Sequence, residues 1–435
     1  METAKIKQLI VEHKDRFLKK GLLVRRTIQD DLAPLLIQRE AIVITGARRS
    51  GKSTLLNLIC RDLMKDPGFN RSSVLYLNFE DERFLDFSYQ DFEKLYDLFL
   101  EIEKPPAKKY FFLDEIQNIK GWERWINRLY EFENVKIFVT GSNAGMSSTE
   151  ISTALTGRNR QITLYPFSFR EFLIARNCPY QEKDLYLKEK KAEIRNLLKE
   201  YVRLGGFPEV VKNKDTSLLE QYFKDILYRD IIARYSIRHI KEMKEICLYL
   251  SSNIGTICSY RNLKEVINSK NISTIKNYLE ILENVFLFFR LNLFDYSIKK
   301  QIYNPGKFYS IDTGFSSSIG FHFSENIGRI YENLVFLELK RRNKEVYYWK
   351  SSNGKEVDFL TKEGTRITGA FQVCFNLENT ATKDREMSGL IAAGKELNVN
   401  QATVLTDNVE GEEKLGNLKV NILPLWKWLL MPLSF

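Results

Sequence analysis

The stretch AIVITGARRSGKSTLLNLI, residues 41–59, carries the most informative spacing of chemically active residues in this chain of 435 residues. Its centre, GARRSGKS, matches the pattern G-x-x-x-x-G-K-[ST] of a loop that binds phosphate. The glycines let the backbone curl so that successive N–H groups point at one anion, and the helix that follows adds partial positive charge. The residues expected to contact a nucleotide are Gly46, Ala47, Arg48, Arg49, Ser50, Gly51, Lys52, Ser53 and Thr54.

Two side chains at the end of this loop have distinct expected roles. Lys52 would reach the β- and γ-phosphates, and the Ser53 hydroxyl would be a ligand of Mg²⁺. ATP and Mg²⁺ are therefore the expected cofactors. The alternative is a glycine-rich turn between a buried strand and a helix, but the apolar strand before the motif and the helical pattern after it favour the phosphate loop.

An acidic pair, Asp114-Glu115, follows the apolar run of the segment KKYFFLDEIQNIKGW, residues 108–122. We expect Asp114 to hold the Mg²⁺ and Glu115 to polarise the attacking water. The alternative is a capped strand end. The pair suits water activation better than the binding of a small acceptor molecule, so the sequence predicts an ATP hydrolase in preference to a phosphotransferase.

These residues need strands and helices that position them. Apolar segments within residues 41–45, 72–84, 108–114 and 135–140 alternate with helical patterns. Such an alternation predicts a parallel sheet covered by helices on both faces, that is, an α/β fold.

Composition restricts the class of protein further. The hydrophobic fraction of 44% and the charged fraction of 28% are typical of a globular protein, and no uncharged apolar run reaches the length of a membrane span. The first residues, METAKIKQLIVEHKDRF, show the pattern of a charged amphipathic helix without a signal-peptide core, so we expect a cytoplasmic location. The five cysteines and three histidines are scattered, so we expect reduced thiols and no structural zinc site. The net charge of +10 favours a polyanion, DNA above all, as partner.

Residues 240–300 show the pattern of a winged helix, with three helices expected in the segments ICLYLSSNIG, SYRNLKEVIN and STIKNYLEILEN. In the third helix, Ile275, Tyr278 and neighbouring apolar residues recur at core spacing. The residues expected to face a DNA major groove are Thr274, Lys276 and Asn277. The alternative is a domain that serves as a lid or contacts another protein.

Taken in order, several motifs resemble those of predicted AAA+-superfamily ATPases of archaea and bacteria. They are GARRSGKST, FFLDEIQNIKGWERWINRLYE, FVTGSNAG, LTGR, YPFSFREF, LGGFPEVV, YRDIIARY, KFYSIDTGF, YENLVFLELKRR and KEVDFL. The resemblance covers nearly the whole chain. It implies a P-loop ATPase core, a helical lid, a winged-helix module and a C-terminal domain similar to PD-(D/E)XK nucleases, whose function in that family is uncharacterised.

Five segments follow from the patterns and the resemblance together. We expect an N-terminal helical extension at 1–38, the ATPase core at 39–175, the helical lid at 176–238, the winged helix at 239–303 and the nuclease-like domain at 304–435.

The resemblance also implies roles for single residues of the core. In AAA+ ATPases a polar residue at the end of the strand 135–140 contacts the γ-phosphate and water, and Ser142 and Asn143 are the candidates here. Arg158, in the LTGR motif, could neutralise charge in the transition state from its own chain or from a neighbouring one in a homo-oligomer. A surface arginine is the alternative.

In the last domain, Glu332 and Asp358 match the helix glutamate and strand aspartate of such nucleases. In those enzymes two carboxylates hold a divalent ion and a lysine orients the attacking water. The tripeptide position reads Gln372-Val373-Cys374, so Gln372 could still offer a carbonyl ligand, whereas Cys374 cannot replace a lysine. Lys355, just before Glu356-Val357-Asp358, could take the lysine's role.

The sequence therefore predicts an ATP-hydrolysing AAA+-type switch that acts on DNA through its C-terminal modules. The alternatives are an ATP-dependent, metal-requiring DNA endonuclease and a nucleotide-switched signalling protein without activity on DNA. No association with a membrane is expected.

Overall fold

The computed structural model describes residues 1–142, 155, 157–319 and 327–432. The chain forms two compact units, Met1–Pro166 with Asn284–Phe286, and Phe167–Glu283 with Leu287–Phe435. In the described part of the chain, no helix is both long enough and apolar enough to span a membrane.

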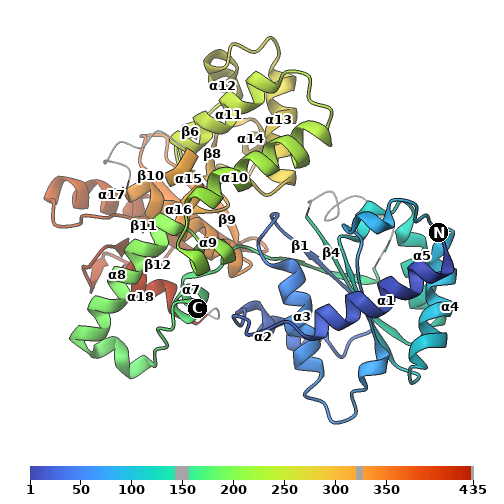
Figure 1. The fold of residues 1–435 in the computed structure, drawn as a ribbon. Coiled ribbons are helices and arrows are strands. Elements are labelled where there is room, and N and C mark those ends of the chain that lie inside the picture. The colour runs from blue at the N-terminus through green and yellow to red at the C-terminus, as the bar shows by residue number, and fades with distance from the viewer. Residues whose placement is uncertain (143–154, 156, 320–326, 433–435) are drawn as a thin grey trace. The chain divides into compact units, whose positions relative to one another are not determined.

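The first unit is built on a five-stranded sheet in the order β2-β3-β4-β1-β5, in which all neighbours are parallel (Figure 1). Its strands are β1 (Ala41–Thr45), β2 (Val74–Asn78), β3 (Lys109–Asp114), β4 (Val135–Gly141) and β5 (Asn159–Thr163). Strands β1, β3 and β4 are buried along their whole length. Burial on both faces explains why they read as continuous apolar runs in the sequence.

Helices cover both faces of this sheet. They are α1 (Thr3–Leu18), α2 (Ile28–Leu32), α3 (Lys52–Leu63), α4 (Asp91–Glu103) and α5 (Trp122–Phe132). One face packs against α4 and α5 through residues such as Phe111 and Trp125, and the other packs against α3 through residues such as Phe112 and Leu55. The predicted α/β fold with a doubly covered parallel sheet is confirmed.

The N-terminal helix α1 is an integral part of this unit. Ile6, Leu9 and Ile10 join the apolar cluster of α4 and α5, whereas Phe17, near the helix end, joins the cluster of α3. The Phe17 ring stacks on Tyr76 of β2 with the ring centroids 4.1 Å apart. Helix α1 therefore shields β2, which is an edge strand.

The chain after β5 passes close to the phosphate-loop motif. The Leu164 amide donates to the Thr45 carbonyl at 2.7 Å, and the Tyr165 carbonyl accepts from Arg26 Nη2 at 2.6 Å. The last residues of the first unit are thus fastened directly beside the motif.

Two residues after Tyr165, the backbone of Phe167 forms hydrogen bonds with residues of the second unit. The Phe167 amide donates to the Gly206 carbonyl and its carbonyl accepts from the Tyr201 hydroxyl, both at 2.7 Å. The buried Asp312 carboxylate in turn accepts from the Gly206 amide at 2.6 Å. These hydrogen bonds therefore bring together three of the motifs named above, YPFSFREF, LGGFPEVV and KFYSIDTGF.

The second unit begins with helices. They are α7 (Phe169–Ala175), α8 (Lys188–Leu204), α9 (Pro208–Asn213), α10 (Ser217–Asp225), the π-helix η7 (Ile226–Ala233) and α11 (Ile240–Ser252). Helix α7 begins at a capping box in which Ser168 and Glu171 satisfy each other's backbone amides.

A small antiparallel sheet follows, with the strand order β6-β8-β7. Its strands are β6 (Ile257–Cys258), β7 (Phe288–Leu291) and β8 (Gly306–Ser310), and its helices are α12 (Tyr260–Val266), α13 (Ile272–Asn284) and α14 (Ile298–Tyr303). Helix α11 begins six residues before the expected segment ICLYLSSNIG and ends three residues before that segment does. Helix α12 ends two residues before the end of SYRNLKEVIN, and α13 begins one residue before STIKNYLEILEN and ends with it.

The last sheet is mixed and six-stranded, in the order β13-β14-β12-β11-β10-β9 (Figure 1). Its strands are β9 (Glu345–Lys350), β10 (Glu356–Glu363), β11 (Arg366–Val373), β12 (Gln401–Thr406), β13 (Gly411–Leu415) and β14 (Leu418–Pro424). The accompanying helices are α15 (Thr313–Ile319), α16 (Ile327–Arg341), α17 (Thr380–Leu397) and α18 (Leu425–Leu429). Helix α17 packs closely on β10, since a Cβ at Gly389 would lie 2.2 Å from the Glu356 carbonyl oxygen.

Candidate functional sites

The loop GARRSGKS lies between the end of β1 and the start of α3. Its backbone is left-handed at Arg49 and Gly51, with φ of 66° and 100°, and Gly46 has φ of 144°. A Cβ at Gly46 would lie 2.2 Å from the Leu164 carbonyl oxygen, so only glycine fits. The glycine therefore serves both the curl of the loop and the passage of the chain after β5.

Lys52 is the first residue of α3 and its side chain lies inside the loop. The ammonium donates to the carbonyls of Gly46 and Ala47 at 3.1 and 3.2 Å, and only 5% of the side chain is exposed. The same ammonium lies 3.6 Å from Glu115 Oε1. The structure thus brings the predicted phosphate-binding lysine and the predicted catalytic carboxylate together.

Asp114, at the end of β3, is fully buried and surrounded by hydroxyl donors. The hydroxyls of Ser53 and Thr140 hydrogen-bond to its carboxylate, and the Tyr76 hydroxyl donates to Oδ2 at 3.0 Å. Burial raises the pKa of Asp114, and the Ser53 and Thr140 hydroxyls oppose this effect. Because Ser53 and Asp114 offer neighbouring hard oxygen atoms, this pair fits the requirements of Mg²⁺.

Glu115 has a left-handed backbone with φ of 52°, which turns its side chain towards the loop. Its amide donates to the Thr140 hydroxyl at 3.0 Å, and its Oε2 accepts from the Ser142 amide at 3.2 Å and from Gln117 Nε2 at 2.5 Å. Burial opposes ionisation, but the charge of Lys52 and these hydrogen bonds outweigh burial and lower the pKa of the Glu115 carboxyl. Glu115 is therefore held as an oriented carboxylate.

Other predicted residues of the loop lie around this centre. Arg48 pairs with Glu80 at 3.2 Å, Ser50 is buried, Thr54 is half-buried and Arg49 is exposed. Asn143 lies outside the described residues.

Arg158 precedes β5 and lies at the opposite end of the sheet from the loop. Its carbonyl accepts from the amide of Ala41, where β1 begins, and its guanidinium pairs with Glu131 at 2.6 Å. The five residues of β1 span about 16 Å between that end and the loop. The structure does not bring Arg158 to the loop of its own chain.

Sequence reasoning missed several residues of this site. The Thr140 hydroxyl donates to the Asp114 carboxylate and accepts from the Glu115 backbone amide, and Arg26 Nη1 donates to the Ser50 carbonyl at 3.0 Å. Lys20 donates to the Ser53 carbonyl at 3.4 Å, and burial lowers its pKa whereas Asp114 raises it. Lys20 and Arg26 follow α1 in a stretch without a recognisable motif, so the packing of α1 alone reveals them.

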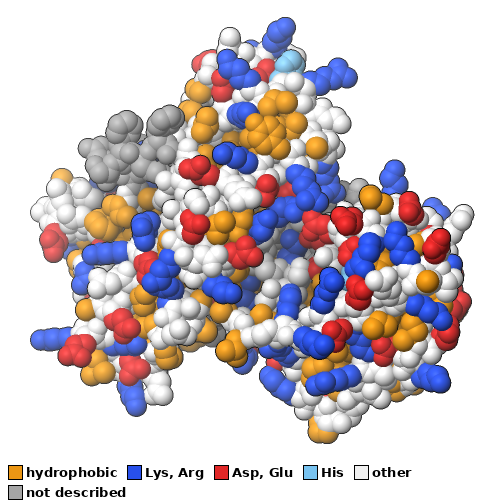
Figure 2. Space-filling view, viewed as in Figure 1, with side chains coloured by type: hydrophobic (Ala, Val, Ile, Leu, Met, Phe, Trp, Pro, Cys, Tyr) orange, Lys and Arg blue, Asp and Glu red, His pale blue; other side chains and the backbone are white. Residues whose placement is uncertain are grey.

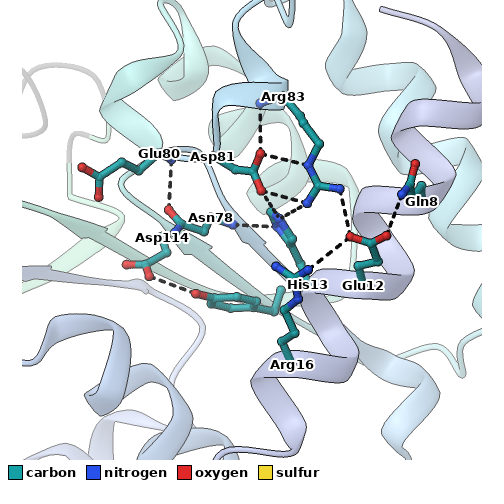
Figure 3. Close-up of polar contacts among 10 residues, drawn as sticks. Gln8, Glu12, His13, Arg16, Asn78, Glu80, Asp81, Arg83 and Asp114 are labelled. Carbon is teal, nitrogen blue, oxygen red and sulfur yellow. Dashed lines mark hydrogen bonds and ion pairs between the residues drawn. The ribbon is translucent and has the colours of Figure 1, made fainter.

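A hydrogen-bonded cluster ties α1 to the segment after β2 (Figure 3). The His13 ring accepts from the Asn78 amide at 3.2 Å through Nδ1 and lies 3.0 Å from Asp81 Oδ2 through Nε2. Arg83 joins Asp81 to Glu12 of α1, at 2.8 and 2.9 Å. Burial lowers the pKa of His13, against the effect of Asp81. This cluster ties α1 to the segment that follows β2, and the His13 ring centroid lies 6.4 Å from that of Tyr76.

The predicted residues of the C-terminal domain also come together, in the second unit. Glu332 of α16 and Asp358 of β10 contact the same ammonium group, that of Lys307 on β8, at 2.9 and 3.2 Å. Gln372 of β11 accepts from the Asp358 amide at 3.2 Å. Lys355 is exposed, and Lys307 was not among the residues that the sequence singled out.

In the predicted recognition helix α13, Lys276 and Asn277 are exposed and Thr274 is half-buried, whereas Ile275 and Tyr278 are buried. Lys276 lies over the Tyr260 ring, 5.3 Å from its centroid. The outward face of α13 is therefore the face that the sequence pattern indicated.

The parallel sheet, the loop after β1 and the acidic pair after β3 define the first unit as a P-loop nucleotide-binding domain of the AAA+ ATPase class. A family model described as an AAA domain matches residues 38–173. Two domains of unknown function, DUF8612 and DUF4143, match residues 195–324 and 327–428.

The chain belongs to the family of the uncharacterized protein MJ1544 of Methanocaldococcus jannaschii. The two chains are 36% identical over 430 residues, which cover 95% of this chain and 92% of the relative. An uncharacterized protein of Haemophilus influenzae is 35% identical over 359 residues, covering 79% of this chain and 84% of its own length.

Solved structures show a more distant likeness. The Aeropyrum pernix ORC1 protein, solved in complex with DNA, is 11% identical, with 70% of this chain and 94% of that chain covered and a TM-score of 0.32. AMPPCP-bound DnaA from Aquifex aeolicus is 16% identical, with 59% and 85% covered and a TM-score of 0.26. Likenesses at these scores carry no conclusion about function.

Proposed function

We propose that this protein is an ATP-hydrolysing switch whose nucleotide state changes how its C-terminal modules engage DNA. The observation that supports hydrolysis most directly is the convergence of Lys52, Asp114, Glu115 and Thr140 at the carboxyl ends of β1, β3 and β4. Ligands of parallel α/β sheets bind at this edge.

The residues suggest how the reaction would proceed. Ser53 and Asp114 would hold Mg²⁺, which would offset charge on the β- and γ-phosphate oxygens. Lys52 would exchange the carbonyls of Gly46 and Ala47 for the phosphates. Glu115, oriented by Thr140 and the Ser142 amide, would then polarise the attacking water.

Arg158 fits this proposal only in an assembly. Since it lies at the far end of the sheet from its own loop, an Arg158 that meets a γ-phosphate must belong to a neighbouring copy. A mixture of Lys52→Ala and Arg158→Ala chains tests this arrangement, because such a mixture forms interfaces in which both residues are intact. Activity in the mixture that exceeds the sum of the two separate variants supports the role, and strict additivity contradicts it.

DNA is the partner that the second unit suits best. The chain order of one helix, a strand, two helices and two further strands, with β8 between β6 and β7 in the sheet and α14 between β7 and β8 in the chain, supports a winged-helix module. Its third helix would present Lys276 and Asn277 to a major groove. In Figure 2, Lys and Arg side chains are interspersed with Asp and Glu over both units. The distribution of charge on the face shown therefore does not mark one surface for DNA.

ATP turnover by the wild type, Lys52→Ala and Glu115→Gln, each with and without duplex or single-stranded DNA, tests the proposal. Lys52→Ala should weaken nucleotide binding, whereas Glu115→Gln should bind normally and lose turnover by about 10²- to 10⁴-fold. Normal hydrolysis by Glu115→Gln would contradict the assigned base. If ATP changes the oligomeric state while DNA affects neither binding nor turnover, the signalling alternative replaces the DNA-directed switch.

A further inference from the structure

The carboxylates that the sequence marked as a nuclease-like site surround a lysine of the chain itself. Lys307 Nζ lies 2.9 Å from Glu332 Oε1, 2.8 Å from Glu356 Oε1 and 3.2 Å from Asp358 Oδ1. Only 3% of the lysine side chain is exposed. An ammonium group has three N–H donors, so each donor has a carboxylate acceptor.

Other donors of the chain engage this cluster as well. Glu332 Oε1 also accepts from the Tyr309 hydroxyl at 2.5 Å, and Asp358 Oδ2 accepts from the Val373 amide at 3.0 Å. These bonds leave Asp358 with an acceptor contact on each oxygen.

Gln372, at the first position of the tripeptide, does not offer the predicted carbonyl ligand. Its carbonyl accepts from the Asp358 amide at 3.2 Å, and its amide group donates to the buried Glu386. The side chain is therefore engaged at both ends. In the described parts of the chain, no group of three or more His, Cys, Asp or Glu residues is arranged to hold a metal ion.

The electrostatics agree with this geometry. Burial alone would lower the pKa of Lys307, but Glu332, Asp358 and Glu356 raise it well above its usual value, so the ammonium is charged. A buried ammonium is costly unless several acceptors compensate it, and here three do. Lys307 therefore provides positive charge where a metallonuclease would use a divalent ion.

We infer that Lys307 is the permanent cation of this site, so that the C-terminal domain holds its three carboxylates through an ammonium group and takes no divalent metal there. The cluster joins β8 of the small sheet to α16 and β10 of the terminal sheet, and it acts as a fixed link between them. A metal-dependent endonuclease does not fit this donor set.

Titration of the nucleotide-free, full-length protein with Mn²⁺ tests the inference. The wild type and Glu356→Gln should bind Mn²⁺ identically, because any binding at the nucleotide site is common to both. Glu356 is the most exposed of the three carboxylates, so this variant disturbs the fold least. If the wild type binds a Mn²⁺ ion that Glu356→Gln does not bind, the inference is overturned.

A second variant makes the opposite prediction. Lys307→Met removes the ammonium but keeps an unbranched stem out to the Cε position, so the three carboxylates should gain one site for Mn²⁺. The double variant Lys307→Met/Glu356→Gln should lose this site again. Mn²⁺ should also raise the melting temperature of Lys307→Met by more than it raises that of the wild type or of Lys307→Met/Glu356→Gln, in which only the nucleotide site can bind the ion. A folded Lys307→Met chain that gains no Mn²⁺ site would show that ammonium and metal do not share this place.

DNA incubated with Mn²⁺ and the wild-type protein provides an independent readout. The DNA should stay intact, and cleavage that Asp358→Ala abolishes would overturn the inference. If Lys307→Met does not fold even with Mn²⁺, the comparison of Mn²⁺ binding by the wild type and by Glu356→Gln still tests whether the three carboxylates take a metal ion. None of these measurements depends on ATP turnover, so they can fail while the proposed ATPase function holds.

Discussion

Replacing Thr140 by valine removes one hydroxyl from the centre of the nucleotide site while keeping a similar side-chain shape. That hydroxyl donates to the Asp114 carboxylate and accepts from the Glu115 amide. A hydrogen bond to a charged group contributes about 1.5–3 kcal/mol, and a buried amide without an acceptor adds a cost of its own. Because each 1.4 kcal/mol corresponds to a factor of ten in rate, kcat should fall by about 10- to 100-fold.

The assay is ATP turnover at saturating ATP over a range of Mg²⁺ concentrations. Thr140→Ser is the matched control, because it keeps the hydroxyl and should retain most of the activity. Thr140→Val should also need more Mg²⁺, since the loss of a hydrogen bond raises the pKa of Asp114 further above its usual value. Nucleotide affinity should change little. A Thr140→Val protein with wild-type kcat would refute the view that this hydroxyl positions Glu115.

Three further predictions concern other parts of the molecule. Gly46→Ala should abolish nucleotide binding in equilibrium titrations, because its Cβ would lie 2.2 Å from the Leu164 carbonyl oxygen, and binding at wild-type strength would contradict the described loop. Phe17→Ala should lower the free energy of unfolding of the first unit by about 3–5 kcal/mol in denaturant titrations, since the ring is buried against Tyr76; a change below about 1 kcal/mol would mean that α1 is dispensable. Burial raises the pKa of Asp312 to about 7, so the stability that its protonated form contributes is present below about pH 4 and is lost as the pH rises to 7. The melting temperature of the wild type should therefore fall over this pH range, and it should fall less in Asp312→Asn. An equal fall in both proteins would exclude Asp312 as the cause.

The core of the first unit could be predicted because its signals are local. The loop motif, the apolar run before it and the acidic pair at the end of another apolar run each lie within one short stretch of sequence. The rule that parallel strands gather their carboxyl ends at one edge then places Lys52, Asp114 and Glu115 together without knowledge of the fold's details.

What could not be predicted depends on contacts between distant parts of the chain. Lys307 meets carboxylates 25 and 51 residues further on, and its spacing in the sequence matches no motif. The one available signal was a lysine at the start of the apolar strand KFYSI, since a charge in such a strand requires partners. Thr140 was visible at the end of its strand, but its two contacts depend on the left-handed turn at Glu115, which no propensity indicates.

The hydrogen bonds on either side of Pro166 restrict the backbone torsions at this position. Leu164 and Tyr165 are tethered next to the phosphate loop, and Phe167 is clamped by Gly206 and Tyr201. A shift of the loop that kept these bonds would have to be taken up by torsions within about one residue. Proline also fixes its own φ angle, so the backbone that links these two sets of hydrogen bonds has few torsions left to vary.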